Sequence, residues 1–170
     1  MKKNLILLIV LITFLCVFSA AIGQNSVFDN CWGKTRSEVK KIYPEFDCPQ
    51  SNISCELFDG DFTHAPDQLF FVFLYFTTGS YSYVEGVYVY IPYAILSKAG
   101  WTKTAENASS IADIILGDDN YYTLSFGDIK EIYMIYPKTS IGCRVADDDL
   151  GGYDVYCQKP YTNFDKLMNF

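Results

Sequence analysis

A pair of cysteines and the turn between them constrain this chain more than any other feature. Cys143 and Cys157 flank the segment VADDDLGGYDV, whose acidic residues and glycines supply the backbone geometry of a turn. When the two cysteines are paired, Val145 falls opposite Val155 on the same face of a hairpin. The spacing therefore predicts a disulfide-closed hairpin over residues 141–158.

Two more cysteines predict a second disulfide bond. Cys48 and Cys55 enclose the short segment PQSNIS, and a bond between them restrains the exit from a helix into a strand. Cys31 is then an unpaired thiol beside Trp32, and we interpret it as a buried side chain rather than a nucleophile. The alternatives are a bond from Cys31 to Cys48 or Cys55, and a dimer linked through Cys31. Structural disulfides persist in oxidising compartments, so the pattern predicts a secreted or periplasmic protein.

The N-terminal residues have the parts of a signal peptide. A pair of lysines precedes an apolar run, and the small residues of Ala21-Ile22-Gly23 mark a cleavage site before Gln24. The alternative is an uncleaved membrane anchor, but the apolar run is shorter than the ~20 residues that a spanning helix needs. We therefore expect residues 1–23 to be removed, no membrane span after cleavage, and a single domain over residues 24–170.

Acidic residues outnumber basic ones, which limits the classes of partner. The formal charge is -7, and the loss of two lysines with the signal peptide would take it to about -9. Nucleic acid and anionic lipid both need a basic surface, so we expect neither as a partner. A basic secreted or envelope protein would be attracted instead, and it is the expected partner.

Hydrophobic patterning predicts an α+β fold that consists mainly of antiparallel sheet, has two or three short helices and is stapled by the disulfides. Residues 69–76, LFFVFLYF, are apolar at both alternations, which predicts a central strand covered on both faces. Residues 87–91, VYVYI, alternate aliphatic residues with tyrosine, and Gly86 marks a bulge or the start of this strand. The other expected strands cover residues 53–58, 121–126, 129–136 and both arms of the closing hairpin.

Capping patterns place the helices. Thr35 lies three residues before Glu38, the reciprocal arrangement of a capping box, and Pro44 ends that helix after about two turns. Pro92 can open a second helix that stops at Gly100. The remaining expectations are a helix or strand over residues 109–116 with a cap at Ser109 or Ser110, a turn at Phe126-Gly127-Asp128, and a helical turn over residues 164–168.

Residues suited to catalysis or metal binding are sparse. His64 is the only histidine and lies in a proline-containing connection between strands, so we expect no Ser-His-Asp or Cys-His arrangement and no zinc site. Carboxylates permit a glycosidase-like pair, with Asp128, Glu131 and Glu85 as candidates, but the sequence indicates no apolar pocket for a protonated acid. The aspartates at residues 147–149 lack the alternating ligands of a calcium loop. We expect no catalytic residues, no metal and no cofactor.

Two segments match the acceptor pattern for N-glycosylation. They are Asn52-Ile53-Ser54 and Asn107-Ala108-Ser109. The sequence leaves open whether either asparagine is modified.

Tyrosines supply the strongest binding signal. Five of them fall in SYSYVEGVYVYIPY, residues 80–93, which contains no basic residue. Tyrosine offers a large contact area with few rotatable bonds and a hydroxyl group for hydrogen bonding. We expect Tyr81 and Tyr83, which lie near the turn, to be exposed. We expect Tyr88 and Tyr90, which lie in the strand, to be buried. The candidate binding residues are Tyr81, Tyr83, Tyr88, Tyr90, Asp147, Asp148 and Asp149.

These observations favour a secreted or periplasmic module without catalytic chemistry that binds or inhibits another protein. One alternative is a carbohydrate-binding or glycan-hydrolysing protein that uses aromatic rings and carboxylates. The other is a structural protein of the cell envelope. An exposed tyrosine row beside paired carboxylates favours the first alternative, whereas a flat acidic face without a pocket favours protein binding.

Overall fold

A computed structural model describes residues 26–117, 122–125, 131–136 and 140–159. The predicted signal peptide, the turn at Phe126-Gly127-Asp128 and the helical turn over residues 164–168 lie outside the described residues. Within the described part of the chain, no helix has both the length and the hydropathy that crossing a membrane requires.

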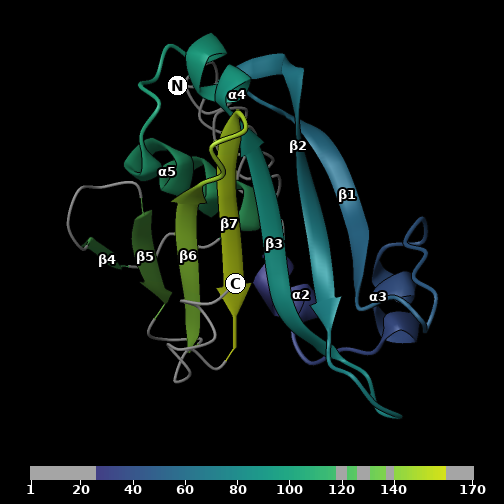
Figure 1. Ribbon diagram of the computed structural model, residues 1–170. Helices are drawn as coiled ribbons and strands as arrows, with labels where there is room; N and C mark the ends of the chain where they lie inside the picture. The colour runs from purple at the N-terminus through teal and green to yellow at the C-terminus, as the bar shows by residue number, and fades with distance from the viewer. Residues whose placement is uncertain (1–25, 118–121, 126–130, 137–139, 160–170) are drawn as a thin grey trace, which may run out of the picture.

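One antiparallel sheet of seven strands organises the molecule, in the order β1-β2-β3-β7-β6-β5-β4 (Figure 1). Its strands are β1 (Ser54–Phe62), β2 (Ala65–Phe76), β3 (Val84–Pro92), β4 (Tyr122–Ser125), β5 (Glu131–Tyr136), β6 (Ile141–Asp147) and β7 (Gly152–Gln158). The first three strands form one meander and the last four form another. Pairing of β3 with β7 joins the two meanders into a continuous sheet.

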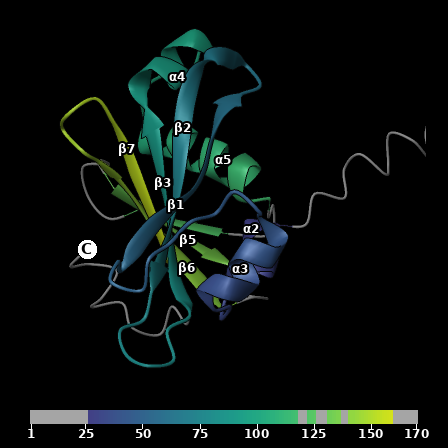
Figure 2. The ribbon, with the colours of Figure 1, turned by 90° about the vertical axis from the view of Figure 1, so that its right-hand side faces the viewer.

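Helices cover one face of this sheet. The described residues contain α2 (Val27–Cys31), α3 (Arg36–Ile42), α4 (Tyr93–Lys98) and α5 (Ala105–Leu116). Figure 2 shows α2, α3 and α5 on the same side of the strands. The predicted α+β fold, with its mainly antiparallel sheet and disulfides, is confirmed, and α2 is an additional short helix that the sequence did not predict.

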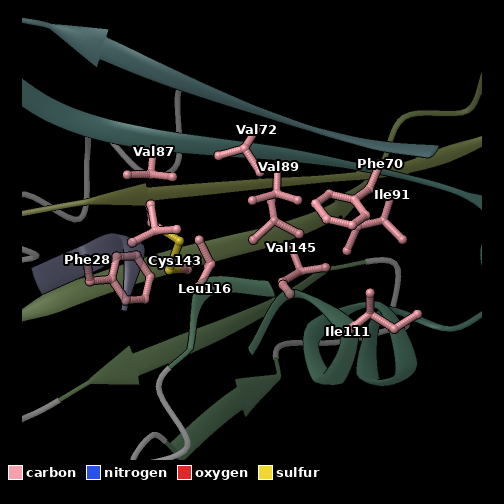
Figure 3. Close-up of a cluster of buried hydrophobic side chains, with 14 of the residues drawn as sticks. Phe28, Phe70, Val72, Val87, Val89, Ile91, Ile111, Leu116, Cys143 and Val145 are labelled. Atoms are coloured by element: carbon pink, nitrogen blue, oxygen red, sulfur yellow. A yellow bond between two sulfur atoms is a disulfide. The ribbon is translucent and has the colours of Figure 1, made fainter. Parts of the chain in front are cut away.

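The core lies between the helices and this face of the sheet. Val87, Val89 and Val145 are fully buried in it, and Figure 3 shows Phe28 from α2 and Leu116 from α5 beside them. These aliphatic side chains come from alternate strand positions, so each strand contributes one side to the core. The burial explains why α2 and α5 pack here although α2 is too short to be stable alone.

Both predicted disulfides are present. Cys143 faces Cys157 across β6 and β7, and Val145 faces Val155 two positions away, as the hairpin register requires. Cys48 is bonded to Cys55, which ties the chain after α3 to the start of β1. Cys31 is an unpaired, buried thiol. Burial raises the pKa of the Cys31 thiol to about 12, so the thiol is protonated at neutral pH and is not a nucleophile.

The capping residues explain the helix boundaries. Thr35 caps α3, and its backbone N–H donates to the Glu38 carboxylate over 2.8 Å, which confirms the predicted capping box. The ambiguous segment is helical and begins earlier than expected, because the Thr104 hydroxyl accepts from the backbone N–H of Asn107. Ser109 and Ser110 are not caps. Their hydroxyls donate to the carbonyl of Glu106 within α5.

The prediction that both faces of β2 are covered is wrong, because only one of its faces is fully buried. Val72 and Leu74 are fully buried, whereas Phe71, Phe73 and Tyr75 on the other face are only partly buried. The strand is internal to the sheet, flanked by β1 and β3, but it is not in the middle. The second apolar face is shielded by rings of neighbouring strands rather than by a second layer of helices.

Removal of the two disulfides should have unequal effects on stability. Replacing Cys143 and Cys157 with alanine should lower the free energy of unfolding by about 3 kcal/mol or more, because it releases a chain constraint and opens space in the core. Replacing Cys48, which is partly exposed, and Cys55, which is buried, should lower it by about 2 kcal/mol, because this bond closes a shorter loop. Urea unfolding of the oxidised protein at neutral pH measures both values. A larger loss for Cys48 and Cys55 would contradict the burial difference.

Candidate functional site

The second face of the sheet is the candidate site, and we call it the open face. It is turned toward the viewer in Figure 1, and among the described residues no helix lies against it. Its aromatic side chains, which alternate with the core residues along the strands, are Phe71, Phe73, Tyr75, Tyr88, Tyr90, Tyr133 and Tyr156. Four of them form a cluster that is separate from the main core.

Strand register assembles the rings into rows. Phe73 lies opposite Tyr88, which in turn lies opposite Tyr156 on β7. In the neighbouring row, Phe71 lies opposite Tyr90, which lies opposite Asp154. The centroids of the Phe73 and Tyr88 rings are 5.9 Å apart, a usual spacing for an aromatic pair. The first row is therefore aromatic across three strands, and the second is aromatic on β2 and β3 and ends at Asp154 on β7.

Two glycines allow rings to lie flat on this surface. A Cβ atom on Gly86 would lie 2.8 Å from the Tyr156 hydroxyl oxygen, and one on Gly152 would lie 2.6 Å from the Tyr90 ring. Each tyrosine thus leans diagonally over the glycine of the neighbouring strand. This close approach, rather than a bulge alone, accounts for Gly86 at the start of the tyrosine-rich strand.

Carboxylates surround the aromatic rows. Glu56 and Asp59 are exposed on the edge strand β1 and lie opposite Phe73 and Phe71. Asp154 lies further in, and its Oδ1 accepts a 2.5 Å hydrogen bond from the Tyr88 hydroxyl. The strands contain eight acidic residues and one basic residue, so the sheet is strongly acidic.

The one basic residue of the strands is already paired. Arg144 Nη2 lies 2.6 Å from Glu131 Oε1. The hydrogen bond from Arg144 lowers the pKa of the Glu131 carboxyl, against the opposing effect of burial. A lowered pKa is the opposite of what the protonated acid of a glycosidase-like pair requires, and the proposed companion Asp128 lies outside the described residues.

Burial perturbs the titrating groups on the open face. Desolvation raises the pKa of the Asp154 carboxyl, although the Tyr88 hydrogen bond opposes this effect. Desolvation also raises the pKa of Tyr88, and it raises the pKa of Tyr156 to about 12. The tyrosines are neutral hydrogen-bonding groups at neutral pH, while the surroundings of Asp154 disfavour its ionised form.

The predicted aspartates at the hairpin tip serve the turn. Asp148 Oδ1 accepts hydrogen bonds from the backbone N–H groups of residues 150, 151 and 152, at 2.8, 2.9 and 2.9 Å. Asp147 Oδ1 accepts from the backbone N–H of Asp149 at 2.9 Å and from the Tyr93 hydroxyl. Asp149 is exposed in a left-handed conformation, with φ of 57°. Within the described ranges, no group of three or more His, Cys, Asp or Glu side chains is placed to hold a metal ion.

The predicted tyrosines divide between two places. Tyr81 is 90% exposed and Tyr83 46% exposed in the loop between β2 and β3. Tyr88 and Tyr90 are partly buried on the open face, and Tyr90 approaches Asp148 at the hairpin tip. The loop and the tip lie at opposite ends of β3, so the structure does not bring Tyr81 and Tyr83 together with the three aspartates.

A polar cavity adjoins Tyr81. Its volume is about 510 Å³, and its lining comes from the N-terminal end of α3, the disulfide loop and the loop between β2 and β3. Arg36 connects these parts, because its guanidinium donates to the Ser82 hydroxyl and to the carbonyl of Asn52, both over 2.6 Å. The lining is rich in hydroxyl groups and includes no carboxylate.

Other sequence candidates have ordinary surroundings. His64 is exposed in the turn between β1 and β2, and its ring lies near Phe62 and Trp101. Asn52 is exposed in the disulfide loop. The Asn107 side-chain amide donates to the Thr102 carbonyl at 2.9 Å and to its hydroxyl at 2.8 Å, so it is engaged within the fold.

Of the residues on the open face, sequence reasoning named only Tyr88 and Tyr90 as binding candidates. It missed Phe71, Phe73, Tyr75, Tyr133, Tyr156, Glu56, Asp59 and Asp154. The alternation of β2 was hidden because both of its faces are apolar. Asp154 was treated as part of the turn region, since nothing local indicates that β7 lies beside β3. One signal was present in the sequence. YDVYC (residues 153–157) and VYVYI (residues 87–91) both alternate along the strand, but this shows that their side chains share a face only once the two strands are known to pair.

Comparison with known proteins adds no identity to this geometry. No protein-family model, no curated protein and no solved structure matches the chain. The candidate site is therefore defined by its own residues.

Loss of the Asp148 carboxylate should destabilise the closing hairpin. Asp148→Ala leaves three backbone N–H groups without their acceptor, which should lower the free energy of unfolding by roughly 1 kcal/mol. Burial opposes ionisation of Asp148, but the backbone hydrogen bonds outweigh it and lower its pKa.

The pH dependence of this effect has a defined sign. The contribution of Asp148 is present above about pH 4, the ordinary pKa of aspartate, and is lost as the pH falls through the lower folded pKa. Urea unfolding at several pH values measures the difference between wild type and variant, with Asp149→Asn as the control. An equal loss for Asp149→Asn, or a difference that grows in acid, would refute this account.

Proposed function

We propose that this protein is a non-catalytic module of an oxidising, extracytoplasmic compartment that binds a basic protein through its open face. The observation that supports this proposal best is the row of partly buried aromatic rings bordered by carboxylates, on a sheet face that the described helices leave uncovered. The two disulfides fit an oxidising compartment. Secretion by the N-terminal signal is part of the proposal.

The shape of the open face favours a macromolecular partner. The cavity of about 510 Å³ lies beside the β2–β3 loop, and a second cavity of about 580 Å³ lies between the helices and the β1–β2 hairpin, so both lie off this face. A sheet face that presents aromatic rings resembles the centre of protein–protein interfaces, where tyrosine is enriched. Small ligands prefer concave sites.

The charge of the open face favours a basic partner. Glu56 and Asp59 border the aromatic rows on β1, Asp154 ends one row on β7, and the single arginine of the strands is paired with Glu131. Complementary charge would speed association and exclude acidic competitors. Aromatic rings beside carboxylates also suit lysine and arginine side chains, because a cation is attracted to the face of the ring.

A specific observation favours a second candidate, carbohydrate binding at Tyr81. The ring of Tyr81 is 90% exposed and borders the hydroxyl-rich cavity of about 510 Å³. An exposed ring can stack on a sugar while hydroxyl and amide groups bind its hydroxyls. The cavity lining includes no carboxylate, so its residues suit sugar binding rather than glycoside hydrolysis, which needs a pair of carboxyl groups.

Charge reversal at the edge of the open face should abolish capture of the partner. We expect Glu56→Lys with Asp59→Lys to weaken binding by at least tenfold, because both carboxylates border the aromatic rows. A pull-down with oxidised residues 24–170 against secreted and envelope fractions of the host, at low and high salt, measures this loss. The matched control is Asp29→Lys with Glu45→Lys, which changes the net charge equally at exposed positions on the helix side.

Capture alone does not test the proposal, because an acidic protein retains basic proteins nonspecifically. We expect one basic protein to be captured by the wild type and by the control variant, Asp29→Lys with Glu45→Lys. The open-face variant, Glu56→Lys with Asp59→Lys, should not capture it. Tyr90→Ala should release it as well. Equal loss with both charge-reversed variants would show that net charge, and not the open face, is responsible.

Replacement of Tyr81 tests the second candidate. Retention on polysaccharide columns should fall to background in Tyr81→Ala and stay unchanged in Tyr90→Ala, since Tyr90 lies on the open face. Tyr81 lies in the loop between β2 and β3 and Tyr90 lies on β3, so Tyr90→Ala removes a tyrosine from the same hairpin and serves as a matched control. If neither variant differs from wild type, the exposed tyrosine does not bind sugar.

A further inference from the structure

Asp154 occupies the centre of the open face in an arrangement that the fold does not require. It lies opposite Tyr90 in one direction and opposite Ala146 in the other. Its row thus begins with aromatic rings on β2 and β3 and then reaches the carboxylate. A neutral or aromatic residue would continue the surface, whereas the carboxylate interrupts it.

The carboxylate of Asp154 forms no salt bridge among the described residues, although the charge of Arg144 acts on it from the neighbouring strand. Its one hydrogen bond there comes from the neutral hydroxyl of Tyr88, over 2.5 Å. Arg144 stands on the neighbouring strand, but its guanidinium is directed to Glu131, with Nη2–Oε1 at 2.6 Å and Nε–Oε2 at 3.3 Å. The Asp154 carboxylate therefore lies among aromatic rings, while the guanidinium of Arg144 is hydrogen-bonded to Glu131 instead.

This arrangement is unfavourable to the isolated protein. Desolvation raises the pKa of the Asp154 carboxyl, and the charge of Asp148 acts in the same direction. The Tyr88 hydrogen bond and the charge of Arg144 oppose this effect without cancelling it. Proteins retain such unfavourable charges mainly at functional sites, where a ligand supplies the missing interaction. The rings of Tyr88 and Tyr90 beside the carboxylate indicate the chemistry of that ligand.

We infer that Asp154 receives an arginine side chain of the partner, with the guanidinium stacked on the tyrosine rings and paired with the carboxylate. Guanidinium is planar and weakly hydrated, so it can pair with a carboxylate and pack on an aromatic ring at the same time. An ammonium group is more strongly hydrated and less suited to this position. The inference rests on the proposed function and adds the recognised group and the residue that recognises it.

The test uses a small probe, so it does not depend on the identity of the partner. N-acetyl-arginine-N-methylamide is titrated into ¹⁵N-labelled residues 24–170, and amide chemical shifts are followed. The control ligand is the corresponding citrulline compound, in which a neutral urea replaces the guanidinium. Saturable shifts should centre on Tyr88, Tyr90 and Asp154, and the citrulline compound should bind at least tenfold more weakly.

Variants assign the effect to one carboxylate. Asp154→Asn should remove the preference for arginine over citrulline, whereas Asp59→Asn, on the edge of the same face, should change arginine binding by less than twofold. Asp154→Asn is expected to fold, because asparagine can still accept the Tyr88 hydrogen bond. Its midpoint of thermal unfolding should rise at neutral pH, and the difference should vanish below about pH 4, since a raised folded pKa makes the ionised form the less stable one.

The outcomes separate this inference from the proposed function. Equal binding of arginine and citrulline, or arginine binding unchanged in Asp154→Asn, would overturn the role of Asp154. If a basic protein is nevertheless captured and then lost with Glu56→Lys and Asp59→Lys, the proposed function stands without it. If arginine binds at Asp154 but no basic protein is captured, the recognition site stands and the partner class is wrong.

Discussion

The pairing of β3 with β7 is the contact on which the rest of the structure depends. It joins a meander of three strands to a meander of four and places Val87, Val89 and Ile91 beside Cys157, Val155 and Tyr153. The helices that lie between these meanders in the chain then pack on one face, where the alternate aliphatic residues are. Without this pairing, two smaller sheets would each have an unprotected edge.

The same pairing creates the opposite face. Because side chains alternate along a strand, the register that buries the valines must bring Tyr88 to Tyr156 and Tyr90 to Asp154 on the other side. Gly86 and Gly152 complete the surface, since a side chain at either position would collide with a tyrosine ring. Core and open face are thus two consequences of one register, and a slip by one residue would exchange them.

The groups that stabilise the closing hairpin differ from the residue that we propose for recognition, Asp154. The disulfide from Cys143 to Cys157 and the turn held by Asp148 stabilise the closing hairpin. Asp154, on the same hairpin, is an anion that burial disfavours. The acidic hairpin tip therefore serves the fold, while Asp154, the third residue of β7, is the better candidate for recognition.

Local chemistry in the sequence determined the disulfides, the hairpin register, the capped helix after Thr35 and the acidic character of the chain, because each depends on residues that are close in sequence. It also indicated that tyrosines within residues 80–93 are candidate binding residues. Only the tertiary structure decided which of them share a surface, since β3 and β7 are separated by about sixty residues and no local rule specifies their register. For that reason Tyr88 and Tyr90 meet Asp154, whereas Tyr81 lies at the far end of the strand beside a different cavity.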